Sequence, residues 1–129
     1  MTPQVLAAEL VRLLNQQDVD GAAALFHPDA ELCFPRFAPR TVYRGEPELR
    51  EFVRWLSAAL PLRTLAVDRI VATDRTAIIE FETAGTSIQG HDFDNTGVLV
   101  LDADAGRIAA LRVYLDTADL ARILEAPVA

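Results

Sequence analysis

Two glutamates that stand two positions apart, Glu80 and Glu82, are the side chains of this sequence best suited to acid–base chemistry. They lie in a β-rich segment, 77–83, in which side chains alternate between faces, so both belong to one face of the strand. Two carboxyl groups so close together in an apolar site cannot both ionise cheaply, and one holds a proton near neutral pH. The pair then offers an acid beside a base, as proton-transfer reactions require.

A second set of polar candidates lies on the segment 91–101. A regular strand here places His91, Phe93, Asn95, Gly97 and Leu99 on one face. We predict that His91 is a third acid–base group and that Asn95 donates a hydrogen bond to a substrate oxygen. The alternative for His91 is an exposed residue at the start of a hairpin.

The composition excludes several other kinds of chemistry. All twelve basic residues are arginine, so a catalytic lysine and a Walker-type phosphate loop are ruled out. The single cysteine excludes an intramolecular disulfide and a multi-cysteine metal site. His91, Asp92 and Asp94 alternate across a strand and cannot converge on one ion. We therefore expect no metal and no cofactor.

Charge and hydropathy limit the partners of the chain. It has 19 acidic and 12 basic residues, a net charge of −7, and no basic tract, which argues against nucleic acids and anionic membranes. The apolar runs are too short to span a bilayer, and the N-terminus does not resemble a signal peptide. We expect a cytoplasmic protein.

The elements that must position these residues follow from periodicity, caps and turns. The sequence predicts helices at 3–16, 18–26, 45–60 and 116–125, and strands at 31–34, 41–43, 65–71, 77–83, 91–101 and 108–115. Helices grouped before a long antiparallel meander indicate a single α+β domain over residues 1–129. Asp116 precedes the last helix, and we interpret it as the helix cap rather than as a catalytic group.

Three short motifs in this order carry a family resemblance. They are Leu25-Phe26-His27-Pro28-Asp29-Ala30, Tyr43-Arg44-Gly45, and Gly106-Arg107-Ile108 leading to Tyr114-Leu115-Asp116-Thr117. The chain resembles, from residue 10 to 123, the SnoaL-like branch of the nuclear transport factor 2-like superfamily. The resemblance implies a cone-shaped α+β barrel: a curved, mostly antiparallel sheet wrapped around three N-terminal helices, with a short C-terminal helix. It also implies an apolar pocket inside the cone and, usually, a homodimer formed through the sheet.

The catalytic patterns of that superfamily are largely missing from this sequence. The base of the ketosteroid isomerases falls on Phe34, and their oxyanion aspartate falls at or beside Gly97. The arginine and two aspartates of the limonene epoxide hydrolases fall on Glu80, Glu82 and Val113, so that Glu82 alone keeps an acid. Neither mechanism is expected in its usual form.

The resemblance and the periodicity disagree about one strand. The mapping turns Glu80 and Glu82 into the pocket, whereas the alternation of Ile79 and Phe81 predicts that these apolar residues face the core. We favour the inward glutamates. Ile79 and Phe81 then lie on the convex face, together with Val98, Val100 and Tyr114, where a partner subunit covers them and Arg112 pairs with its acids.

Two hypotheses for the function follow. In the first, the protein is an isomerase, cyclase or hydratase that acts on a small apolar metabolite, with Glu82, Glu80 and His91 as catalytic groups. In the second, it is a non-catalytic ligand-binding or dimerisation domain. Both hypotheses use the same predicted pocket, lined by Asn95, Phe34, Leu32, Tyr43, Trp55, Phe93, Leu111 and Val113. The sequence leaves open whether the protein is an enzyme.

Overall fold

The computed structural model describes residues 1–34, 38–61 and 63–124, and its first two helices begin at the predicted caps. Helix α1 (Pro3–Asn15) begins after Thr2, whose Oγ1 accepts a hydrogen bond from the Val5 amide at 3.2 Å. Helix α2 (Val19–Ala24) begins after Asp18, whose Oδ1 accepts from the Gly21 amide at 2.8 Å. These local hydrogen bonds fix both starts without help from the rest of the fold.

The predicted end of the second helix is wrong. Strand β1 (Phe26–Cys33) already begins at Phe26, which pairs with Ile108 of the last strand and is buried. His27 and Pro28, which follow the predicted helix, lie inside this strand. The gain from burying Phe26 against a distant strand outweighs the local preference, as is common for short helices.

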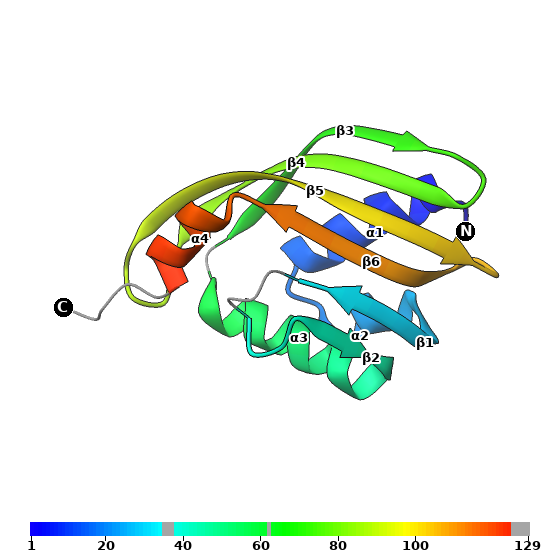
Figure 1. The fold of residues 1–129 in the computed structure, drawn as a ribbon, viewed down its shortest axis with the longest axis horizontal. Helices are drawn as coiled ribbons and strands as arrows, with labels where there is room; N and C mark the ends of the chain where they lie inside the picture. Colours follow the sequence, from blue (N-terminus) through cyan, green and yellow to red (C-terminus); the bar gives the residue numbers. More distant parts are fainter. Residues whose placement is uncertain (35–37, 62, 125–129) are drawn as a thin grey trace.

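The remaining elements form a curved six-stranded sheet (Figure 1). They are β2 (Val42–Arg44), α3 (Gly45–Ala59), β3 (Thr64–Ala72), β4 (Thr76–Thr86), β5 (Asp92–Asp104), β6 (Arg107–Leu115) and α4 (Thr117–Leu124). The strand order is β2-β1-β6-β5-β4-β3, and every pair is antiparallel except β1 with β6. The predicted end of α4 at residue 125 lies outside the described residues.

The hairpin between β5 and β6 joins two central strands of the sheet. Its turn residues Ala105 and Gly106 have φ angles of 51° and 77°. Two successive positive φ values are typical of the tight turn that matches the twist of a hairpin. Beyond an irregularity between Asp102 and Ala103, the register pairs Leu99 with Val113 and Gly97 with Leu115.

The core lies between the concave side of the sheet and the helices. Leu6 and Leu10 of α1 and Leu49 of α3 pack against it, each at most 1% exposed. On β4, Ile79 and Phe81 are buried in this core. The prediction that these two residues lie on the convex face is therefore wrong, and the periodicity of the strand was the correct guide.

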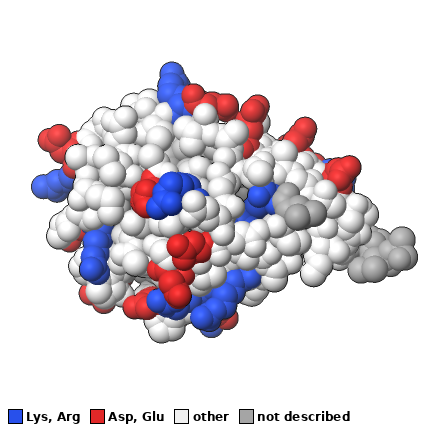
Figure 2. Space-filling model, turned by 180° about the vertical axis from the view of Figure 1, so that it is seen from behind, with Lys and Arg blue, Asp and Glu red and all other residues white. Residues whose placement is uncertain are grey.

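Acidic and basic side chains both lie on the surface of the molecule (Figure 2). Figure 2 shows acidic and basic residues interspersed over one face of the molecule rather than gathered by sign. Within the part of the chain that the structure describes, no helix is both long and apolar enough to cross a membrane.

Candidate apolar binding site

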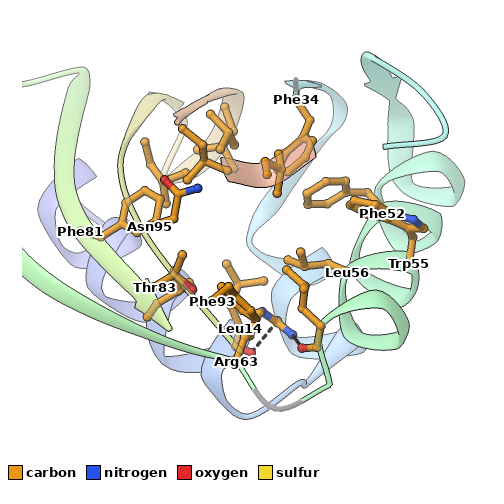
Figure 3. A pocket seen from close by; sticks show the side chains of 17 residues that line it. Leu14, Phe34, Phe52, Trp55, Leu56, Arg63, Phe81, Thr83, Phe93 and Asn95 are labelled. Carbon is orange, nitrogen blue, oxygen red and sulfur yellow. Dashed lines mark hydrogen bonds between the residues drawn. The ribbon is translucent and has the colours of Figure 1, made fainter. Parts of the chain in front are cut away.

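An apolar pocket of about 70 Å³ lies between α3 and the concave face of the sheet (Figure 3). Its walls are Leu14, Phe34, Phe52, Trp55, Leu56, Leu60, Arg63, Leu65, Phe81, Thr83, Phe93, Asn95, Leu99, Leu111, Val113, Leu115 and Leu120. Phe34 belongs to an aromatic cluster, with its ring centroid 5.1 Å from that of Phe52 and 5.7 Å from that of Trp55. Such a wall binds flat or branched apolar groups through surface burial and ring contacts.

Arg63 is the most unusual residue of the wall. It is 5% exposed, and its Nη2 and Nη1 donate to the carbonyl oxygens of Leu14, at 2.9 Å, and Leu60, at 3.4 Å. These carbonyls lie at the C-terminal ends of α1 and α3, where the partial negative charge of the helix dipole favours a cation. Burial lowers the pKa of Arg63.

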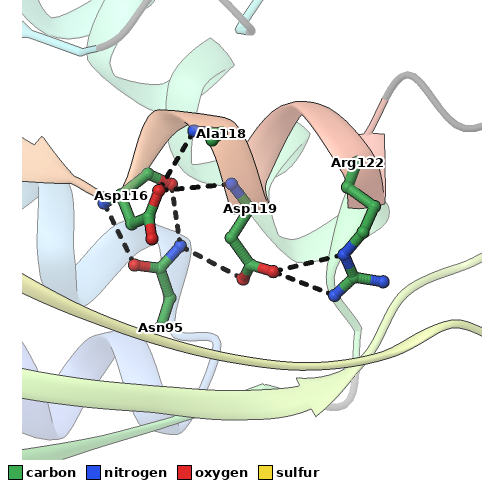
Figure 4. Close-up of polar contacts among 5 residues, drawn as sticks. All are labelled: Asn95, Asp116, Ala118, Asp119 and Arg122. Carbon is green, nitrogen blue, oxygen red and sulfur yellow. Dashed lines mark hydrogen bonds and ion pairs between the residues drawn. The ribbon is translucent and has the colours of Figure 1, made fainter.

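Thr83 and Asn95 are the other two polar residues of the wall, and they are directly opposite each other on β4 and β5. The Thr83 hydroxyl is buried and has no hydrogen-bond partner among the described residues. Asn95, by contrast, is fully engaged. Its Oδ1 accepts from the Asp116 amide, and its Nδ2 donates to the Asp116 carbonyl, both at 3.1 Å (Figure 4).

These hydrogen bonds make Asn95 a clamp that holds the start of α4 against β5. Asp119 of α4 also contacts the Asn95 amide, at 3.5 Å. Leu120, one residue further along α4, is 5% exposed and closes one side of the pocket. The substrate hydrogen bond predicted for Asn95 therefore competes with an existing structural role.

Asp116 caps α4, as predicted. Its Oδ1 accepts from the amides of Ala118 at 3.1 Å and Asp119 at 3.3 Å (Figure 4). The negative charge at this helix start is also favoured by the dipole.

The predicted inward orientation of Glu80 and Glu82 is wrong. Phe81 and Thr83, their neighbours in sequence, line the pocket, so the two glutamates are turned to the convex face. Glu80 accepts a hydrogen bond there from Arg69 Nε at 2.7 Å, and Glu82 is exposed. Two charged groups on the solvated side of a sheet avoid the desolvation that the pocket would impose.

The other predicted site residues divide into two groups. The structure places Phe34, Trp55, Phe93, Asn95, Leu111 and Val113 in the pocket wall. His91, Leu32 and Tyr43 lie outside it. Leu32 is 2% exposed and Tyr43 is 0% exposed, and both belong to the hydrophobic core. The Tyr43 hydroxyl accepts a hydrogen bond from the Arg40 amide at 3.2 Å. His91 is half-buried in the β4–β5 connection, where its amide donates to Ser87 Oγ.

Sequence reasoning missed Arg63 and Thr83. Strand alternation would have found Thr83, because it lies two residues after Phe81. Arg63 precedes β3, and no local pattern in the sequence marks it as buried.

A second hollow lies beyond the Thr83–Asn95 pair and is acidic. Its lining includes these two residues and the carboxylates of Glu82, Asp94, Asp116 and Asp119. Within the described ranges, no group of three or more histidine, cysteine, aspartate or glutamate side chains could hold a metal ion.

Comparison with known proteins gives the family. The model of the SnoaL-like domain matches residues 7–111. The chain belongs to the SnoaL-like family. A search of curated protein sequences finds no match.

Solved structures agree with this assignment at the level of the fold. An NTF2-like protein of Burkholderia thailandensis is 24% identical, with a TM-score of 0.86 over 98% of this chain and 99% of that one. An NTF2-like protein of unknown function from Burkholderia pseudomallei is 20% identical, with a TM-score of 0.88 over 96% and 98%. TerC, co-crystallised with polyporic acid, is 16% identical, with a TM-score of 0.85 over 96% and 98%. These likenesses confirm the NTF2-like cone.

Proposed function

We propose that this SnoaL-like protein binds a small, mainly apolar molecule in the pocket between α3 and the sheet. The observation that carries the proposal is the apolar pocket itself, walled by Phe34, Phe52, Trp55, Phe81 and Phe93. Apolar cavities remain empty of water when they lack polar partners and take up apolar guests instead. Burying a guest here contributes roughly 25 cal/mol for each Å² of apolar surface removed from water.

Binding is better supported than carboxylate catalysis in the pocket. The polar side chains of its lining, within the described residues, are Arg63, Thr83 and Asn95, none of which is an ordinary general base. The glutamates proposed for proton transfer belong to the opposite face of β4. TerC, whose fold is similar, was co-crystallised with polyporic acid, which supports a small-molecule role for the cone.

The sole tryptophan of the chain provides a direct test. Trp55 lies in the pocket wall, so its fluorescence should change when a guest enters. Titration with toluene, a neutral probe, should give a saturable change. Val113→Phe, which adds bulk inside the pocket, should weaken binding at least about tenfold, because overpacking removes the space. Val100→Phe on the convex face of the neighbouring strand is the matched control and should bind normally.

Failure of toluene to change the Trp55 signal would refute the proposal. Equal weakening by Val113→Phe and Val100→Phe would also refute it, because the effect would then not depend on the pocket.

We propose in addition that the protein is a homodimer formed through the convex face. The register joins Val71 to Ile78 and Ile78 to Val100 across three strands, and Val98 to Tyr114 beside them. Tyr114 is 55% exposed, Val71 49% and Ile78 40%. A contiguous apolar surface of this kind is typical of an interface, and a second copy offers the same surface.

Arg112, expected to pair across this interface, already binds Asp102 of its own chain at 2.9 Å. Apolar contact therefore has to supply most of the association. Light scattering should give twice the chain mass of 14.1 kDa at micromolar concentration, and Ile78→Asp should give the monomer mass. A monomer for the unmodified protein would refute the dimer.

A further inference from the structure

Arg63 is a buried positive charge without a carboxylate partner among the described residues. Its side chain lines the pocket, the residue is 5% exposed, and it takes part in none of the ion pairs of the described chain. The less buried Arg50 and Arg112, by comparison, both have acidic partners. Buried charges in proteins are normally paired, and arginine does not escape the cost by losing its proton.

The two helix ends satisfy only part of this guanidinium. The carbonyl of Leu14 accepts from Nη2 at 2.9 Å, whereas the contact of Nη1 with the Leu60 carbonyl is long, at 3.4 Å. The buried Nε–H has no acceptor among the described residues. An unmet buried donor costs about 1–3 kcal/mol, and more when it belongs to a charged group.

The second unmet polar group of the pocket lies at the same end. Leu65 pairs with Thr83, and Arg63 is two residues before Leu65, so the register brings Arg63 and Thr83 to one end of the β3–β4 pair. Figure 3 shows both side chains at this end of the pocket, away from Phe34. The Thr83 hydroxyl can donate a hydrogen bond, as can the Arg63 Nε–H.

We infer that the pocket takes an apolar ligand that carries a carboxylate, and that Arg63 binds this carboxylate with Thr83 as a second donor. The inference rests on the proposed function, because it specifies the ligand of the same pocket. The apolar body lies against the aromatic wall, and the anion lies at the end of the pocket that holds Arg63 and Thr83 (Figure 3). Arginine is suited to this task because its fork of N–H donors matches the geometry of a carboxylate.

The test compares benzoate with benzamide, which have the same shape and differ in charge. Titrations that follow Trp55 fluorescence should give a dissociation constant at least about tenfold lower for benzoate, because a charge-assisted hydrogen bond is roughly twice as strong as a neutral one. The net charge of −7 repels anions, so the field of the whole protein cannot produce this preference. The preference should also persist in 0.5 M salt, because a buried pair is screened only weakly.

Variants then assign the preference to one residue. Arg63→Met keeps much of the side-chain volume and should bind benzoate and benzamide equally. Arg54→Met, which removes the same charge from an exposed position on α3, should keep the preference. Circular dichroism verifies the folding of each variant, and the comparison in the unmodified protein needs no variant at all.

The remaining outcomes distinguish a failure of this inference from a failure of the proposed function. Equal affinities for the two probes in the unmodified protein would overturn the carboxylate site and leave the apolar pocket in place. A preference that survives in a folded Arg63→Met variant would show that another group binds the anion. Absence of any signal for toluene, benzoate and benzamide would overturn both proposals.

Discussion

The Asn95 clamp offers the most direct test of how the pocket is closed. Replacing Asn95 by leucine keeps the side-chain size and removes its hydrogen bonds to the start of α4. Two of these bonds join Asn95 to the Asp116 backbone at 3.1 Å, and the third reaches Asp119 at 3.5 Å. The two shorter bonds contribute about 0.5–1.5 kcal/mol each, and the long one contributes little.

The expected net loss is about 1–2 kcal/mol in the free energy of unfolding. Asp116 is exposed, so water replaces part of what its backbone loses, which keeps the loss toward the lower end. The new leucine faces an apolar pocket and recovers part of the rest by burial. For a chain of this length the loss corresponds to roughly 3–10 °C in Tm.

Urea unfolding followed by circular dichroism measures the loss, and hydrogen exchange locates it. The amides of α4 should exchange faster in Asn95→Leu, while those of α1 should not change. Thr96→Val, on the exposed side of the same strand, is the control and should stay within about 0.5 kcal/mol. A loss below about 0.5 kcal/mol for Asn95→Leu, or unchanged exchange in α4, would show that Asn95 does not hold this helix.

Three further changes test the fold around the site. Asp116→Ala should lower the free energy of unfolding by about 0.5–2 kcal/mol in urea melts, and Asp116→Asn should recover most of it, because either side chain caps α4. Gly97→Ala should cost about 1–3 kcal/mol by thermal unfolding, since its Cβ would lie 2.5 Å from the Tyr114 carbonyl oxygen; an unchanged Tm would contradict this packing. The hydrogen bond from Arg112 holds the pKa of Asp102 below its ordinary 3.8, so the stability it adds is present above that pH and lost on acidification. Asp102→Asn should therefore show a shallower fall in stability below pH 4, and parallel acid titrations would refute the pairing.

Features with a local physical cause were predictable from the sequence. Thr2 and Asp116 cap helices because a short polar side chain reaches amides two or three residues away. The turn before β6 is marked by Gly106, because glycine adopts a positive φ without steric cost. The buried face of β4 was also predictable from the sequence, because Ile79 and Phe81 alternate with polar residues. Transferring positions from distant relatives reversed that face, because a shift of one residue turns every side chain of a strand over.

The parts of the candidate site that depend on distant contacts were decided by the tertiary structure alone. Asn95 and Asp116 are 21 residues apart, and only the pairing of β5 with β6 brings the amide of one to the backbone of the other. Arg63 binds a carbonyl 49 residues away, at the end of α1, and is buried because two helices end around it. An arginine beside a strand normally indicates surface in a sequence. Its burial depends on which elements pack over it, and local patterns do not contain that information.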